Sequence, residues 1–170
     1  MRLPTLCLAI LGVPVSAAAL ALLHRIDEPQ LHAPLGPVVF VCEHGNVKSL
    51  IAREWFNRLA AERGLDTRAL SRGLSPEPAV PPAIGQRLQE DGFDVRGFRP
   101  QALAPADVAA ASRLVMIGAE PPPWTAGSAV PVDRWDGIRP ASERYEASRD
   151  ALRERIATLV ESLARAPSGR

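Results

Sequence analysis

Cys42, Lys48 and Ser49 stand in an order that suits chemistry on a negatively charged group. Four apolar residues, Val38–Val41, lead into Cys42, and a short glycine-containing loop separates it from Lys48 and Ser49, where a helical pattern begins. A parallel strand that ends in such a loop and leads into a helix forms an anion site, because backbone N–H groups and the helix dipole face the ligand. The same field favours the thiolate of Cys42, which is its nucleophilic form.

This arrangement predicts phosphoryl transfer to a cysteine. Cys42 would attack phosphorus and form a phosphocysteine, the loop amides and Lys48 would hold the negative charge, and Ser49 would hydrogen-bond to the thiolate. Lys48 is the only lysine among 20 basic residues, so its position at the end of the loop stands out. The chemistry needs no metal ion and no organic cofactor. The residues expected to line the phosphate are Glu43, His44, Gly45, Asn46, Val47 and Ser49.

A purely structural interpretation of the same residues stays open. Cys42 could be a buried residue at the end of an apolar strand, and His44 could face solvent instead of donating to an oxyanion or tuning the thiolate. We expect the side chain of Glu43 to point outward, because a carboxylate beside a bound phosphate is unfavourable. These three residues do not predict a metal site, since adjacent residues rarely converge on one ion and no distal ligand cluster accompanies them.

Apolar runs of strand length alternate with helical patterns along the chain. The helical segment after Lys48 places Leu50, Ile51, Trp55, Leu59 and Ala60 on one face. Alternating strands and helices predict a parallel sheet. We therefore expect an α/β fold, a three-layer sandwich whose central parallel sheet of about four strands has helices on both sides. The expected strands are 38–42, 66–73, 112–118 and 128–135, and the expected helices are 48–63, 83–92, 103–111 and 141–165.

Charge, cysteine content and the N-terminal segment narrow the classes of function. The 20 basic and 19 acidic residues nearly cancel, which gives no sign of a nucleic-acid partner. Residues 1–23 predict a signal peptide or an N-terminal anchor, and therefore an exported (periplasmic or extracytoplasmic) or membrane-anchored protein with possible membrane contact through this segment. Residues 24–36 predict a linker and residues 37–166 the domain. Cleavage would leave Cys42 as the only cysteine, which excludes an intramolecular disulfide and a thiolate zinc site.

The segment around Cys42 resembles the signature of the low-molecular-weight protein tyrosine phosphatases and of the arsenate reductases that share their fold. Their pattern is a strand, Cys, five residues, Arg, Ser and a helix, and this chain has VVFVCEHGNVKSLIAREWFNRLA. The segments ALSRGLSP, PAIGQRLQEDGFDVRGFRPQAL, DVAAASRLVMIG and RYEASRDALRERIATLVESL resemble later parts of the family in the same order. The resemblance spans residues 36–165. It implies this fold, a cysteine nucleophile, and a phosphate-containing small molecule or a phosphoprotein as the partner.

Two positions depart from the family. Lys48 replaces its arginine, and an ammonium group cannot make the bidentate grip that a guanidinium makes on a phosphoryl group. The family's general acid is an aspartate, usually before proline, in a loop ahead of the last helix. Asp136 is our candidate for this acid and Asp133 is a second, whereas an alignment anchored on Trp135 puts Arg139 at this position and leaves no acid.

Three functions are compatible with these residues. The first is a cysteine-dependent hydrolase of the protein-tyrosine-phosphatase kind, impaired by Lys48. The second is a non-catalytic phosphate- or phosphoprotein-binding module, a pseudophosphatase. The third is an arsenate reductase, which would need an external thiol because no cysteine follows Cys42.

Overall fold

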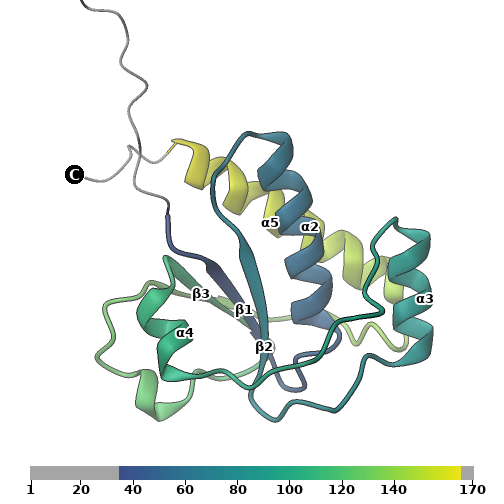
Figure 1. The fold of residues 1–170 in the computed structure, drawn as a ribbon, viewed down its shortest axis with the longest axis horizontal. Coiled ribbons are helices and arrows are strands. Elements are labelled where there is room, and N and C mark those ends of the chain that lie inside the picture. Colours follow the sequence, from purple (N-terminus) through teal and green to yellow (C-terminus); the bar gives the residue numbers. More distant parts are fainter. Residues whose placement is uncertain (1–34, 166–170) are drawn as a thin grey trace, which may run out of the picture. The chain divides into compact units, whose positions relative to one another are not determined.

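Four short strands form the centre of the fold in the computed structural model, which describes residues 35–165 (Figure 1). They are β1 (Val38–Cys42), β2 (Ala69–Gly73), β3 (Arg113–Ile117) and β4 (Val132–Trp135). Their order is β2-β1-β3-β4, and each neighbouring pair is parallel. The carboxyl ends of all four strands therefore meet at one edge of the sheet. The predicted α/β class and the four-stranded parallel sheet are confirmed.

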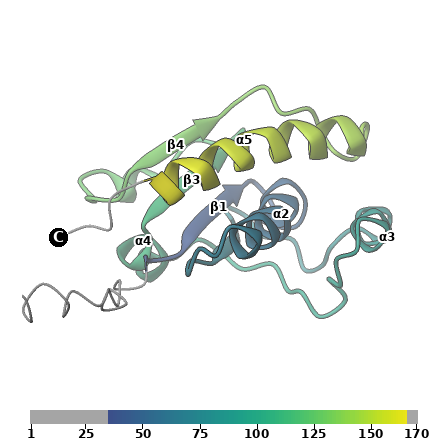
Figure 2. The same cartoon turned by 90° about the horizontal axis from the view of Figure 1, so that it is seen from above.

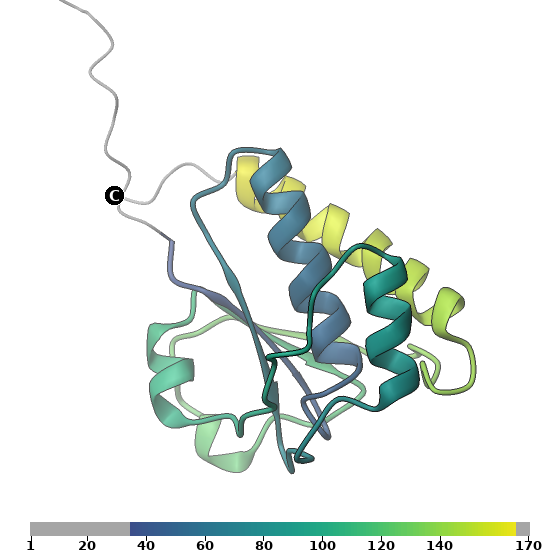
Figure 3. The same cartoon turned by 45° about the vertical axis from the view of Figure 1, so that its right-hand side comes forward.

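Helices cover both faces of this sheet (Figures 2 and 3). Helices α2 (Lys48–Glu62) and α5 (Tyr145–Arg165) pack against each other on one face, and α4 (Pro105–Ala110) lies on the other. Helix α3 (Pro82–Glu90) lies beside α2, and a short 3₁₀ turn, η1, spans Pro123–Thr125. The core on the α2 and α5 face includes Phe40, Phe56, Val115, Ile117 and Ile156, and the core on the α4 face includes Val39, Val41, Leu103, Val108, Leu114 and Met116.

The apolar pattern of the sequence explains the position of β1 and α2. All five residues of β1 are buried, as expected for an inner strand covered on both faces. On α2 the predicted face is buried, apart from Leu59, which is partly buried. Together β1 and α2 hold the two ends of the Cys42 loop on rigid elements.

The last helix begins later than its sequence pattern predicts. Instead of starting at residue 141, α5 starts at Tyr145, and residues 136–144 form a loop whose Ile138 and Ala141 side chains are buried. The hydroxyl of Tyr145 donates a hydrogen bond of 2.7 Å to Asp91, just beyond α3. This tertiary contact fixes the first turn of the helix and explains the shorter element.

The predictions for the N-terminal segment fall almost wholly on residues that the structure does not describe. The signal peptide or anchor at 1–23 lies outside the described residues, as does most of the linker at 24–36. Within residues 35–165, no helix combines the length and apolarity needed to cross a membrane.

The ion pair between Arg72 on β2 and Asp107 on α4 ties α4 to the sheet, and we predict that Asp107→Asn destabilises the fold. The two side chains are 15% and 13% exposed, and two hydrogen bonds of 2.8 and 2.9 Å join them. Burial raises the pKa of Asp107, but hydrogen bonds from Arg72 and the Ala104 amide, with the charge of Arg72, bring the pKa below its ordinary 3.8. Asp107→Asn leaves the Arg72 guanidinium without a counter-charge, so the free energy of unfolding at pH 7 should fall by about 2–3 kcal/mol.

Urea denaturation at several pH values tests this prediction. Because the folded-state pKa of Asp107 is depressed, its contribution is present above pH 3.8 and is lost as the pH falls through the folded-state value. The difference in the free energy of unfolding between wild type and Asp107→Asn should therefore become smaller below pH 3.8. Asp94→Asn is the control, since hydrogen bonds from Arg96 lower the pKa of Asp94 to about 2 but the pair is exposed to solvent. Equal losses of unfolding free energy in Asp107→Asn and Asp94→Asn would contradict the stabilising role of the ion pair between Arg72 and Asp107.

Candidate active site

The loop between β1 and α2 carries most of the predicted site. Cys42 ends β1, residues 43–47 form the loop, and Lys48 is the first residue of α2. The residue before the helix is Val47, whose side chain cannot cap the helix N-terminus. The first amides of α2 therefore stay free for an external acceptor.

The carbonyl groups of residues 42–45 point toward β2 and the segment that follows it. The oxygens of residues 42–44 each accept one hydrogen bond: Cys42 from the amide of Leu74 (3.1 Å), Glu43 from the amide of Ser75 (2.8 Å) and His44 from the amide of Glu77 (3.2 Å). The oxygen of Gly45 lies 3.2 Å from the hydroxyl of Ser71 on β2. A peptide group points its N–H opposite to its C=O. The amides of residues 43–46 therefore face the other side of the loop, and no acceptor within residues 35–165 takes a hydrogen bond from the amides of 43–48.

Two glycines allow this loop to lie against the end of β2. Gly45 has a φ of +68°, in the left-handed region, and a Cβ atom placed on it would lie 2.7 Å from the backbone nitrogen of Gly73. A Cβ atom on Gly73 would in turn lie 2.9 Å from the nitrogen of Gly45. Both contacts are with backbone atoms, which cannot move aside, so neither position accepts a side chain.

A chain of hydroxyl groups leads to the sulfur of Cys42, which is 3% exposed as a residue. The Sγ atom lies 3.1 Å from Oγ of Ser49, and the hydroxyl of Ser71 lies 2.9 Å from the same oxygen. The single proton of Ser71 has two acceptors within reach, the carbonyl of Gly45 and Oγ of Ser49, and Ser49 is the closer. When Ser71 donates to Ser49, the proton of Ser49 is free to point at the sulfur, which is the arrangement that stabilises a thiolate. Ser71 was missed by sequence reasoning. The sequence places Ser71 two residues before the end of β2, but this position indicates a role at the site only once β2 is known to pair with β1.

Lys48 lies at the other end of the loop and extends toward the end of β3. A Cβ atom placed on Gly118, the residue after β3, would lie 2.8 Å from the Nζ atom of Lys48. The residue is partly buried, and its ammonium group forms no ion pair with a carboxylate of the described part of the chain. The site thus has one cation that no protein anion neutralises there.

The remaining loop residues divide into exposed and buried ones. Glu43 is exposed, and the His44 side chain is 52% exposed at the rim. Asn46 is 1% exposed, and its side-chain amide donates to Glu77 and to the carbonyl of Ala79. Asn46 therefore offers its backbone amide to the concave side of the loop, while its side chain is used to bind the neighbouring segment.

The structure places the candidate acids differently. Asp136 follows β4 at the carboxyl edge of the sheet, and its side chain is 62% exposed with Oδ2 3.5 Å from Nη2 of Arg134. Asp133 accepts two hydrogen bonds of 2.9 Å from Arg113, the first residue of β3, and is thus held toward the opposite edge. Arg139 is exposed and contributes its carbonyl to Ser148. This placement favours Asp136 over Asp133.

A metal centre is not indicated by the described residues. Among residues 35–165, no three His, Cys, Asp or Glu side chains come together as ligands. The chemical groups gathered at the site are a thiol, two hydroxyls, a set of unpaired amides and one ammonium group.

These features define an α/β domain with a cysteine-containing anion loop at the carboxyl edge of its parallel sheet. Residues 37–120 match the family model described as low molecular weight phosphotyrosine protein phosphatase. By this match the chain belongs to the low molecular weight phosphotyrosine protein phosphatase family. The class of site is thus that of a cysteine-based phosphatase or arsenate reductase.

Solved structures support the fold. A low molecular weight protein tyrosine phosphatase from Bacillus subtilis is 19% identical with a TM-score of 0.66, covering 76% of this chain and 98% of its own. An arsenate reductase from Archaeoglobus fulgidus is 23% identical with a TM-score of 0.56, and the match covers 73% of this chain and 98% of the arsenate reductase. A YwlE mutant from Bacillus subtilis is 19% identical with a TM-score of 0.64, covering 75% and 98%. A sequence comparison with curated proteins gave no match.

Proposed function

We propose that this protein is a cysteine-dependent phosphatase that acts through a phosphocysteine, on a phosphate-containing small molecule or a phosphoprotein. The observation that carries the proposal is the orientation of the loop: the carbonyls of residues 42–45 face β2 and the segment after it, and the amides of residues 43–48 are unpaired within the described part of the chain. Cys42 and Lys48 stand at the two ends of this set of donors. Donors fixed before the substrate arrives are the main source of transition-state stabilisation in such sites.

The reaction has two steps. The Cys42 thiolate forms a bond to phosphorus while the bond from phosphorus to the leaving oxygen breaks, and Asp136 gives its proton to that oxygen. A water molecule then loses a proton to Asp136 and attacks phosphorus, which releases inorganic phosphate and restores the thiolate. Ser49 donates to the sulfur as it leaves, since it lies 3.1 Å from Sγ.

A non-catalytic phosphate-binding role is the second candidate. It is favoured by the replacement of the family's arginine with Lys48 and by the exposure of Asp136, which has no buried environment to orient it. Arsenate reduction is a weaker alternative, because Cys42 is the only cysteine within residues 35–165 and an external thiol would have to reduce it.

Hydrolysis of aryl phosphates by the full-length protein tests the proposal. We expect Cys42→Ser to abolish turnover and Asp136→Asn to lower it by about 10²-fold for phenyl phosphate, which has a poor leaving group. The loss should be smaller for p-nitrophenyl phosphate, whose leaving group needs little protonation. Asp133→Asn is the matched control and should retain activity. Wild-type turnover equal to that of Cys42→Ser would refute catalysis, and phosphate protection of Cys42 from alkylation would then identify a binder.

A further inference from the structure

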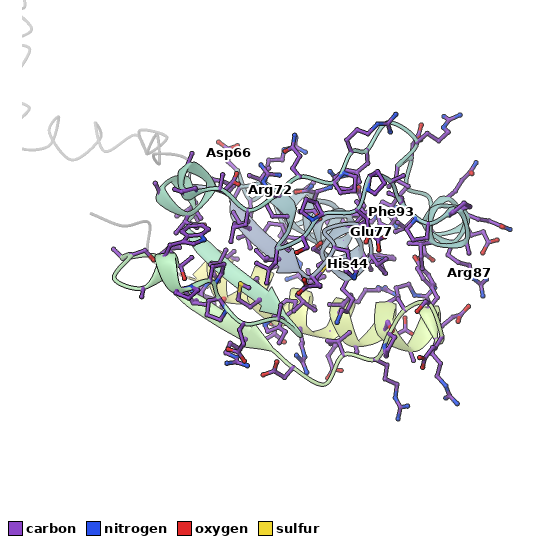
Figure 4. All side chains as sticks on the ribbon, turned by 90° about the horizontal axis from the view of Figure 1, so that it is seen from below. His44, Asp66, Arg72, Glu77, Arg87 and Phe93 are labelled. Atoms are coloured by element: carbon purple, nitrogen blue, oxygen red, sulfur yellow. The ribbon has the colours of Figure 1, made fainter. Side chains whose placement is uncertain are left out.

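Glu77, in the segment between β2 and α3, holds the Cys42 loop at two points. Its backbone amide donates to the carbonyl of His44 at 3.2 Å, and its carboxylate accepts a hydrogen bond of 2.6 Å from the side chain of Asn46. Figure 4 shows the side chains of His44 and Glu77 close together at the rim, where Nε2 and Oε1 are 4.0 Å apart. Neither the sequence pattern nor the proposed chemistry assigns Glu77 a role.

Asn46 shows why this contact matters for the loop. It lies in the middle of the anion-binding segment and is 1% exposed, so each of its polar atoms needs a partner. Both protons of its side-chain amide go to the segment after β2, one to Glu77 and one to the carbonyl of Ala79 at 2.9 Å. Loss of the carboxylate would leave one buried N–H group without an acceptor.

We propose that Glu77 is a positioning residue that holds the loop in its anion-binding form through Asn46; the inference rests on the proposed function. Hydrogen bonds to residues 71–79 hold the loop in its orientation. Among these hydrogen bonds, the one from the side chain of Asn46 to Glu77 is the only one whose acceptor is charged. Such bonds are about twice as strong as neutral ones. A carboxylate near a phosphate site repels the anion and weakens its binding. The position of Glu77 beside the loop is therefore explained by the hydrogen bond that it accepts from Asn46.

Glu77→Ala and Glu77→Gln separate this role from a simple charge effect. The Ala variant removes the acceptor, and the Gln variant keeps an acceptor oxygen of the same reach without the charge. We expect Glu77→Ala to weaken phosphate protection of Cys42 against iodoacetamide about tenfold, and Glu77→Gln to recover most of the loss. If Glu77 acts only by repelling anions, both variants would instead bind phosphate more tightly than wild type, and the proposal would be wrong.

A double-mutant cycle tests the link to Asn46. If Glu77 acts through Asn46, the double variant Asn46→Ala/Glu77→Ala should be no weaker for phosphate than the worse single variant. Additive losses would show independent effects and overturn the inference. Thermal unfolding of each variant shows whether the fold is retained, and the Gln variant keeps the test valid if the Ala variant unfolds.

Hydrogen exchange distinguishes failure of this inference from failure of the proposed function. In ligand-free full-length protein, the amides of Leu74 and Ser75, which donate to the loop carbonyls of Cys42 and Glu43, should exchange faster in Glu77→Ala than in wild type, while those of β1 stay unchanged. This readout requires neither turnover nor phosphate. Unchanged exchange at Leu74 and Ser75 would overturn the role of Glu77 even if the wild type hydrolyses aryl phosphates. Faster exchange at these amides in a protein without turnover would remove only the phosphatase assignment.

Discussion

Lys48→Arg is expected to raise kcat for p-nitrophenyl phosphate by about 10²–10³-fold, the rate equivalent of about 2–4 kcal/mol of transition-state stabilisation. The ammonium of Lys48 reaches the site beside Gly118 and is a single point charge. A guanidinium at the same place donates two parallel hydrogen bonds to equatorial phosphoryl oxygens, and its geometry is retained as the phosphoryl group becomes planar. Steady-state kinetics of the two full-length proteins measures the difference.

A charge-free control separates geometry from charge. Lys48→Met keeps the length of the side chain without the ammonium group, and it should lose both phosphate protection of Cys42 and turnover. The series arginine, lysine, methionine should then rank kcat in that order. If Lys48→Arg is slower than wild type, the loop is built around lysine, and the site differs from the family's in more than one residue.

Gly45→Ala should remove phosphate binding and reduce turnover by about 10² or more, because the loop amides can no longer converge on the ligand. The added Cβ atom would lie 2.7 Å from the nitrogen of Gly73, and the φ of +68° disfavours any side chain. Since the obstructing atom belongs to the backbone of β2, relief requires movement of the loop itself. Phosphate protection of Cys42 against alkylation gives the most direct measurement.

Gly64 supplies the matched control for this substitution. Its φ is +67°, nearly the same as that of Gly45, but no atom lies within 4 Å of a Cβ placed on it. Gly64→Ala should therefore cost about 1–2 kcal/mol of stability from backbone strain and leave phosphate binding intact. If both variants lose phosphate binding equally, strain or lower stability explains the effect, and the close approach of Gly45 to Gly73 does not.

The sequence contains most of the information about the elements and little about the contacts between them. The apolar run of β1 and the helical face of α2 are local patterns, and both elements formed where those patterns predicted. The start of α5 was placed too early because its first turn is set by the contact between Tyr145 and Asp91, 54 residues apart. The periodicity of the helix sequence does not reveal a partner that lies so far away in the chain.

The same distinction applies to the candidate site. Cys42, Lys48 and Ser49 lie within one short segment, so their spacing alone predicted that they would gather around one ligand. Ser71 lies on β2 and Glu77 lies in the segment after it, and both reach the loop only because β2 pairs with β1 in a particular register. The sequence favoured Asp136 over Asp133, with Arg139 as the alternative that leaves no acid. The structure adds that Asp136 follows β4 at the carboxyl edge of the sheet, whereas Arg113 binds Asp133 near the opposite edge.

The most direct test of the account is the detection of a phosphoryl group on Cys42. Full-length wild type and Lys48→Arg would be mixed with p-nitrophenyl phosphate, quenched rapidly with denaturant, and digested, and the peptide that contains Cys42 would be analysed by mass spectrometry. We predict a phosphorylated Cys42 in both proteins and none in Cys42→Ser. Absence of the phosphoryl group from Cys42 in both proteins would contradict the assignment of Cys42 as the nucleophile.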